Sequence, residues 1–281
     1  MSFLNLFRDT KKSQSVVLID VTADSVAGAY ALYKESETPT LLYTRRLPLD
    51  IREGEPCEQA MVRALTILGN ELIREGAPIL MRATGNGHAD TVLVSVDTPW
   101  QETKVRTENF EREKPFMFTK TIVATAIEKT SIVPTGKFLA DESIVSTILN
   151  GYETHDPYGK HTRRASVTVI TSFIEKIIFD TIVSILRDLF HTKHIFIIAS
   201  GSLRYQAIRA AFPHERRPDT SSLVQALEAA NTKKLWIPGL PPKIVPVLAG
   251  HIAGAVRQTT TTPPDLHLLL MALYYSRHAS E

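Results

Sequence analysis

This chain of 281 residues has little cysteine and no long hydrophobic run. Its one cysteine, Cys57, cannot form a disulfide within the chain. No apolar stretch reaches the roughly 18 residues that a membrane-spanning helix needs. Residues 1–12 lack the uninterrupted apolar region of a secretory signal, although Phe3, Leu4, Leu6 and Phe7 could lie shallowly in a membrane surface. We therefore expect a cytoplasmic protein that can also sit at the inner face of the cell membrane.

The chain also lacks an excess of charge of either sign. Its formal net charge is +2, so no broad electrostatic footprint for nucleic acid is present, and we expect no nucleic-acid partner. A hydrophobic content of 43% and a charged content of 22% are typical of a globular protein. The length allows one large domain or two ordinary ones.

The first hundred residues show the pattern of a layered α/β unit. Three consecutive apolar segments predict an antiparallel meander of strands over 16–20, 26–33 and 40–47. Pro56 suits the first turn of a following helix, and Gly76 suits the residue just past its end. We expect a loop over 77–90 and a further strand over 91–96.

A different pattern begins at Trp100. The periodicity predicts a strand near 103–107, a helix over 119–129, and two strands over 143–152 and 164–172 that form a hairpin. The order strand, helix, strand, strand describes a small α+β module over residues 101–172.

The chain then returns to alternating helix and strand. Ser172 and Glu175 fit a capping box, which places the start of a helix at this point, and a regular apolar stripe continues to Leu189. A strand over 194–200 and a short helix over 203–212 follow.

Three stretches together resemble the FtsA and PilM proteins of the actin-like superfamily. They are the hairpin over 16–33, the segment VLVSVDTPW over 92–100, and the segment ILNGYETHDPYGKHTRRASVTV over 148–169. The resemblance implies an actin-like (ribonuclease H-like) α/β lobe over 16–100 and 173–213, interrupted by the 101–172 interaction module. A flexible segment, 1–15, precedes the lobe.

Residues 214–281 depart from that family. Half of the sixteen prolines follow Phe212, and the second phosphate turn that an actin-like clamp requires is missing. We expect a divergent, irregular tail in which 222–230, 245–256 and 266–275 can form helices. The sequence leaves open a lineage-specific replacement, a truncated second lobe or residues read out of frame.

The resemblance places the first phosphate turn, and hence ATP and Mg²⁺, at Asp20, Thr22, Ala23, Asp24 and Ser25. Family members usually have Asp-x-Gly-Thr here, whereas this chain has Thr22 for the glycine and Ala23 for the threonine. A β-branched side chain hinders close approach of the backbone to phosphate, and Asp24 adds negative charge. We therefore expect nucleotide binding to be weak or lost, and we assign no catalytic residue. His191 and His194 lack a third ligand, so no metal site is predicted either.

The resemblance favours a non-enzymatic, FtsA-like scaffold of bacterial cell division, with self-association and division proteins as partners. An ATPase of the superfamily and a PilM-like adaptor for a type IV pilus platform remain the alternatives. Candidate interaction residues lie in or beside the 101–172 module: Trp100, Tyr152, Lys160, Arg163 and Arg164.

Overall fold

The computed structural model describes residues 13–34, 37–154, 156–211, 257–258 and 265–278. These residues form two compact units. Unit 1 consists of the described residues up to Trp100 together with those from Lys176 onward. Unit 2 is Gln101–Glu175.

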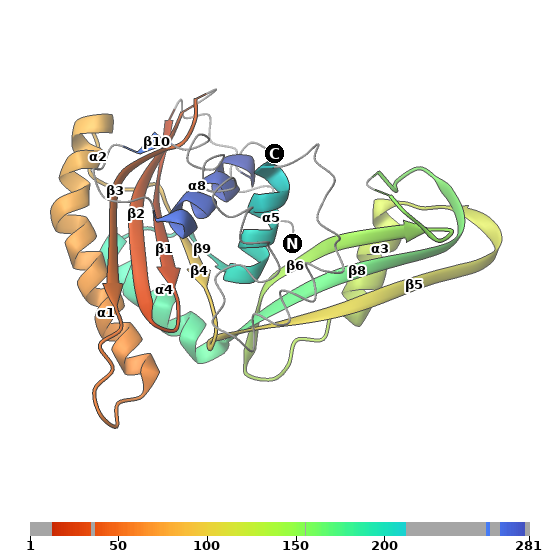
Figure 1. Ribbon diagram of the computed structural model, residues 1–281, viewed down its shortest axis with the longest axis horizontal. Helices are drawn as coiled ribbons and strands as arrows, with labels where there is room; N and C mark the ends of the chain where they lie inside the picture. The colour runs from red at the N-terminus through yellow and green to blue at the C-terminus, as the bar shows by residue number, and fades with distance from the viewer. Residues whose placement is uncertain (1–12, 35–36, 155, 212–256, 259–264, 279–281) are drawn as a thin grey trace, which may run out of the picture. The chain divides into compact units, whose positions relative to one another are not determined.

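Unit 1 is built on a six-stranded sheet with the order β10-β3-β2-β1-β4-β9 (Figure 1). Its strands are β1 (Ser13–Val21), β2 (Ser25–Lys34), β3 (Thr40–Pro48), β4 (Thr91–Val96), β9 (Ile195–Ala199) and β10 (Arg257–Gln258). The first three form an antiparallel meander, whereas β4 pairs parallel to β1 and β9 pairs parallel to β4. The order β3-β2-β1-β4-β9 with these directions is that of a ribonuclease H-like fold, with β10 added at the β3 edge, so the predicted fold class is confirmed.

Helices cover both faces of this sheet (Figure 1). Helix α1 (Cys57–Glu71) packs against β2, β3 and α4 (Lys176–Phe190), while α5 (Ser200–Ala211) and α8 (Leu266–His278) lie on the opposite face. The two-sided cover explains why nearly every residue of β1 and β4 is buried. A Cβ on Gly69 of α1 would lie 2.5 Å from Leu189 Cδ1, which shows how closely α1 and α4 approach.

The predicted end of the first helix at Gly76 is wrong. The helix continues through a π-turn, Leu72–Gly76, into α2 (Ala77–Thr84), and ends at Gly85, which has a φ of 77°. Pro78 lacks the N–H that a regular helix needs, and the wider turn accommodates it, with the Ala77 N–H donating to the Leu72 carbonyl. A Cβ on Gly76 would lie 2.5 Å from the buried ring of Tyr30, so this glycine serves packing rather than termination.

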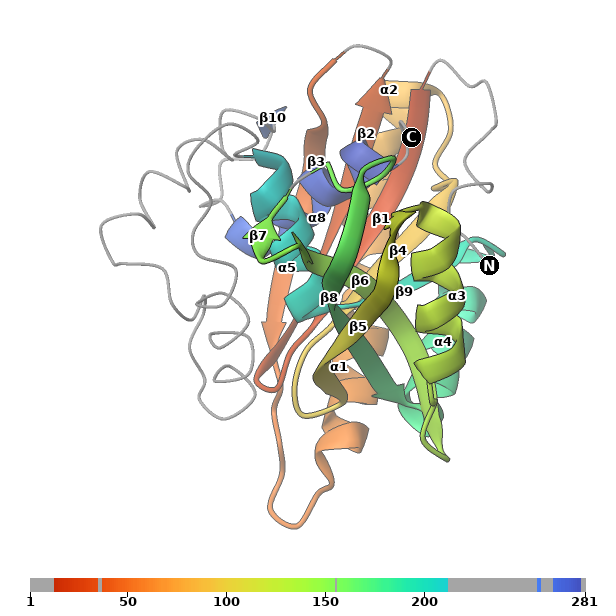
Figure 2. The same ribbon diagram turned by 90° about the vertical axis from the view of Figure 1, so that its right-hand side faces the viewer.

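Unit 2 is a four-stranded sheet in the order β5-β8-β6-β7 with one helix along it (Figure 2). Its elements are β5 (Gln101–Met117), α3 (Lys120–Thr130), β6 (Lys137–Leu149), β7 (Tyr152–Glu153) and β8 (His161–Glu175). Thr119 caps α3 by accepting a hydrogen bond from the Ile122 N–H. The core between helix and sheet contains Phe116, Phe118, Val123, Leu149, Ala165, Val167 and Val169.

Several boundaries in this region differ from the sequence prediction. The strand predicted near 103–107 is β5, which continues to Met117 in its pairing with β8. The strand predicted over 143–152 ends at Leu149, because Asn150 and Gly151 adopt positive φ values of 49° and 88° and reverse the chain into β7. Ser172 does not cap a helix: β8 runs to Glu175, since Phe173 and Ile174 are held in the ladder between β5 and β6. Helix α4 therefore begins at Lys176.

The tail contributes one well-packed helix to unit 1. The segment predicted over 266–275 is α8, and it packs on β1, β2 and α5 with most of its apolar side chains buried. The predicted segments 222–230 and 245–256, and the amphipathic residues 3–7, lie outside the described residues. None of the described helices combines the length and apolar character that crossing a bilayer requires.

Candidate functional site

One row of residues crosses four strands of the unit 1 sheet at the carboxyl end of β1. Asp20 of β1 is in register with Ser95 of β4 on one side and with Ala27 of β2 on the other, and Ala27 is in register with Arg46 of β3. Side chains in register on adjacent strands point to the same face of a sheet. Because Ala27 is small, the long side chain of Arg46 can cross β2 and reach Asp20.

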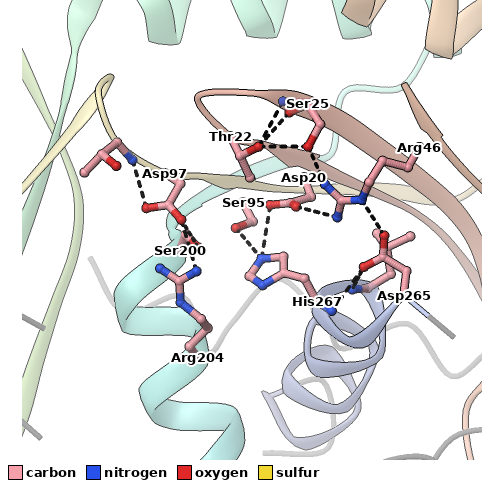
Figure 3. Close-up of polar contacts among 12 residues, drawn as sticks. Asp20, Thr22, Ser25, Arg46, Ser95, Asp97, Ser200, Arg204, Asp265 and His267 are labelled. Carbon is pink, nitrogen blue, oxygen red and sulfur yellow. Dashed lines mark hydrogen bonds and ion pairs between the residues drawn. The ribbon is translucent and has the colours of Figure 1, made fainter. Parts of the chain in front are cut away.

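Asp20 is the buried centre of this row, with 1% of its surface exposed (Figure 3). Its Oδ2 accepts a hydrogen bond from Arg46 Nη2 at 3.1 Å, and its Oδ1 lies 3.1 Å from His267 Nε2. His267 Nε2 also lies 3.0 Å from Ser95 Oγ. Each carboxylate oxygen of Asp20 therefore has a nitrogen atom of the chain 3.1 Å away, but by geometry only Oδ2 accepts a hydrogen bond.

These neighbours determine the charge state of Asp20. Burial alone raises the pKa of its carboxyl, but the neighbouring His267 and Arg46 side chains outweigh burial, and the pKa lies below its ordinary value of 3.8. Asp20 is therefore ionised at neutral pH in the folded chain.

Helix α8 holds His267 in place through Asp265. The Asp265 side chain accepts hydrogen bonds from the backbone N–H groups of His267 and Leu268 at 3.1 and 3.2 Å, which caps the helix. Its other oxygen accepts a hydrogen bond from Arg46 Nε at 2.7 Å. The same carboxylate thus starts α8 and ties it to β3.

The turn after Asp20 is closed by its own side chains. Thr22 Oγ1 donates to Asp24 Oδ1 at 2.8 Å and lies 3.0 Å from Ser25 Oγ. The Thr22 hydroxyl is the main cause of a pKa of Asp24 below its ordinary value. Thr22 is not among the described non-glycine residues with positive φ, and Ala23 is exposed at the tip of the turn.

A second carboxylate, Asp97, follows β4 at the same end of the sheet. Its Oδ2 accepts hydrogen bonds from Ser200 Oγ at 3.3 Å and from Arg204 Nη1 at 3.0 Å, both on α5 (Figure 3). Its Oδ1 accepts from the Thr98 N–H at 2.8 Å. Ser200 is the first residue of α5 and directly follows β9. Strand β9 corresponds to the strand predicted over 194–200, which returns the chain to the lobe.

The arrangement around Asp20 does not fit Mg²⁺ and ATP. A magnesium ion binds carboxylate and water oxygens at about 2.0–2.1 Å in octahedral geometry, whereas Arg46 and His267 lie against both Asp20 oxygens. The turn itself presents the carboxylate of Asp24. Among the residues that the structure describes, no group of three or more His, Cys, Asp or Glu side chains could hold a metal ion.

The candidate interaction residues differ in exposure and in the contacts they make. Trp100 is 3% exposed and follows a cis Thr98–Pro99 bond, whereas Tyr152 is 79% exposed on β7. Lys160 Nζ donates to Thr154 Oγ1 at 3.1 Å, and Arg164 forms an exposed ion pair with Glu111 at 2.7 Å. Arg163 is also exposed.

Sequence reasoning missed Arg46, Ser95, Asp265 and His267. The register of the two predicted hairpins would have placed Arg46 in the row of Asp20, because the pairing of β1 with β2 and of β2 with β3 fixes that position. For His267 only a weak local signal exists, the Asp265 cap before an apolar helix.

Comparisons with known proteins give distant similarities. No protein-family model and no curated protein match the chain. Similar solved structures include the PilM-PilN type IV pilus biogenesis complex, at 14% identity over 70% of this chain and 51% of that chain, with a TM-score of 0.39. The cytoplasmic domain of EpsL, an inner membrane component of the type II secretion system of Vibrio cholerae, is 9% identical over 93% of this chain and 94% of that chain, with a TM-score of 0.33.

RuvC of T. thermophilus, in complex with a Holliday junction substrate, is also similar: 9% identity over 95% of this chain and 94% of that chain, with a TM-score of 0.38. This chain spans about half the length of the matched chain in the PilM-PilN structure. The fold assignment rests on the strand order and directions given above.

Proposed function

We propose that this chain is a scaffolding adaptor that works through protein–protein interaction without using ATP. The observation that carries the proposal is that Arg46 donates a hydrogen bond to Asp20 Oδ2 while His267 Nε2 lies 3.1 Å from Oδ1, so nitrogen atoms of the chain lie beside both oxygens. A lobe that needed Mg²⁺ and ATP would leave this carboxylate accessible to a hydrated ion. Here its charge is compensated from within the chain.

Unit 2 supplies the interaction surface in this proposal. Large apolar side chains that are at least one third exposed are Met117, Ile132, Val133, Ile148 and Tyr152. Unit 1 also exposes five such side chains, Ile51, Ile67, Ile73, Met81 and Ile177, and singly exposed apolar groups are normal on a protein surface. The assignment to unit 2 therefore rests on the resemblance of the 148–169 segment to the FtsA and PilM insert.

Two biological settings follow from that resemblance: an FtsA-like role in cell division, and a PilM-like role at a pilus or secretion platform on the inner face of the membrane. Neighbouring genes and pairwise interaction assays with division proteins and with pilus-platform proteins distinguish them. The adaptor proposal itself requires that this chain binds either division proteins or pilus-platform proteins.

A matched pair of variants tests which surface is used. Tyr152→Arg changes a 79% exposed side chain of unit 2, and Ile177→Arg changes an 80% exposed side chain of α4 in unit 1. We expect Tyr152→Arg to abolish partner binding or self-association, measured by sedimentation velocity of the purified mixture, and Ile177→Arg to leave it intact. Failure of the wild-type chain to self-associate or to bind either protein set, together with a diffuse fluorescent fusion in cells, would overturn the proposal.

ATP is tested separately by calorimetric titration with ATP and Mg²⁺. We expect no heat of binding at micromolar to low millimolar ATP. Micromolar affinity that Asp20→Ala removes would restore the ATPase alternative.

A further inference from the structure

The guanidinium of Arg46 is surrounded by oxygen atoms from three separate elements. Nη2 donates to Asp20 Oδ2 at 3.1 Å, Nη1 to Ser25 Oγ at 2.7 Å, and Nε to Asp265 Oδ2 at 2.7 Å (Figure 3). All three nitrogen atoms are thus used. Two carboxylates and one hydroxyl from β1, β2 and the start of α8 converge on a single positive charge.

That set of oxygens is the type that a hard divalent cation binds. Mg²⁺ and Mn²⁺ take carboxylate and hydroxyl or water oxygens, commonly with one or two carboxylates from the protein and water at the other positions. Without a cation between them, the carboxylates of Asp20 and Asp265 would repel each other in a site where the Asp20 side chain is 1% exposed and that of Asp265 is 15% exposed.

We propose that Arg46 is a tethered cation: its guanidinium fills a latent divalent-cation site made by Asp20, Asp265 and Ser25. The positive charge between Asp20 and Asp265 is therefore a side chain of unit 1 itself. In a metal-dependent lobe, a bound ion would supply that charge. Helix α8 takes part in this arrangement, because Asp265 is both a ligand of the guanidinium and the cap of the helix.

The Ala27 position explains why an arginine can fill this role. The guanidinium must cross one strand to reach Asp20, a distance of about two interstrand spacings, or roughly 9–10 Å. Only the long side chains of Arg and Lys carry a positive charge that far, and the fork of Arg can contact several oxygens at once.

The test replaces the tethered cation and offers a free one. Arg46→Gln removes the charge and keeps an amide donor on a shorter side chain. The double variant Arg46→Gln with Asp20→Asn also removes the buried negative charge. Arg45→Gln is the matched control, because Arg45 is the neighbouring residue on β3 and pairs with Glu71 at the surface.

Each protein is unfolded with urea in MgCl₂ or MnCl₂ from zero to 10 mM at constant ionic strength, and Mn²⁺ binding is measured directly by electron paramagnetic resonance. We expect no response from the wild type or from Arg45→Gln. Arg46→Gln is expected to bind Mn²⁺, and a concentration ten times its dissociation constant raises the folding equilibrium constant about elevenfold. The double variant should lose most of that response.

If Arg46→Gln is unfolded in buffer, circular dichroism during the Mn²⁺ titration provides the readout, and refolding by Mn²⁺ is the expected result. The proposal is overturned if the wild type gains as much from Mn²⁺ as Arg46→Gln does. It is also overturned if Arg46→Gln, folded or unfolded, does not respond to either ion. None of these results depends on partner binding, so the adaptor proposal can fail or hold independently.

Discussion

Asp20 and Asp97 end two adjacent parallel strands, yet their charges are compensated in different ways. Asp97 is 19% exposed in its side chain and is served by its neighbour Thr98 and by one helix, α5. Asp20 is 1% exposed and depends on β3 and α8, which lie 26 and 247 positions away in sequence. Both ends depend on distant residues, since Ser200 and Arg204 lie 103 and 107 positions from Asp97. The end of β1 differs because its carboxylate is buried and is contacted from two elements, β3 and the start of α8.

The largest expected effect comes from removing the charge that compensates Asp20. Arg46→Met leaves a buried carboxylate with only His267 beside it. Because the Arg46 side chain is 36% exposed, we expect the free energy of unfolding to fall by about 2–3 kcal/mol, less than for a fully buried pair. Urea unfolding followed by circular dichroism measures the change. Arg45→Met, on the same strand but paired at the surface, should change stability by no more than about 0.5 kcal/mol. Equal losses for the two variants would contradict the comparison.

The next effect concerns the space that Arg46 crosses. Ala27 is fully buried between Asp20 and Arg46, so Ala27→Leu should displace the guanidinium and cost about 1–3 kcal/mol of unfolding free energy. If displacement is the cause, Ala27→Leu should cost much less in an Arg46→Met background. Full additivity in this double-mutant cycle would instead indicate simple overpacking.

Acid titration separates Asp20 from the other carboxylates. Because its pKa is lower in the folded chain than the ordinary value of 3.8, ionised Asp20 stabilises the fold above about pH 4. That contribution is lost as the pH falls through the lowered folded pKa. Asp20→Asn, which cannot ionise, should therefore lose less stability between pH 5 and pH 2.5 than the wild type does, as measured by urea unfolding at each pH. If both proteins lost the same unfolding free energy over this pH range, the result would show that His267 and Arg46 do not lower the pKa of Asp20.

The smallest effect is expected at Asp97. Arg204→Met removes a partly exposed partner, while the Thr98 N–H and Ser200 hydroxyl still donate to the carboxylate. We expect a loss of about 0.5–1 kcal/mol in the same urea assay. A loss as large as that of Arg46→Met would mean that both strand ends are held in the same way.

Much of the fold followed from sequence pattern, because local periodicity controls the strands of unit 1. The strand over 91–96 was predicted with its observed bounds, and the first three strands were predicted to within a few residues. The errors arose where non-local packing overrode a local signal. Gly76 was interpreted as a helix end but packs against Tyr30, and Ser172 was interpreted as a cap but lies in the central strand of unit 2.

The candidate site was less predictable than the fold. Asp20 was identified from its place at a strand end, and the altered turn at Thr22 and Asp24 pointed away from nucleotide binding. The groups that contact Asp20 could not be found in the same way, since Arg46 reaches it through strand register and His267 through the packing of a distant helix. The pairing of the predicted hairpins can link residues 20 and 46, but a single sequence gives no pattern that links residue 267 to either.

The most direct test of the central claim is the coupling free energy between Asp20 and Arg46. It is obtained from urea unfolding of the wild type, Asp20→Asn, Arg46→Met and the double variant at pH 7. If the guanidinium compensates the buried carboxylate, the coupling should be about 2 kcal/mol or more, because Asp20→Asn then rescues much of the damage caused by Arg46→Met. A coupling below about 0.5 kcal/mol, typical of an exposed ion pair, would contradict the account.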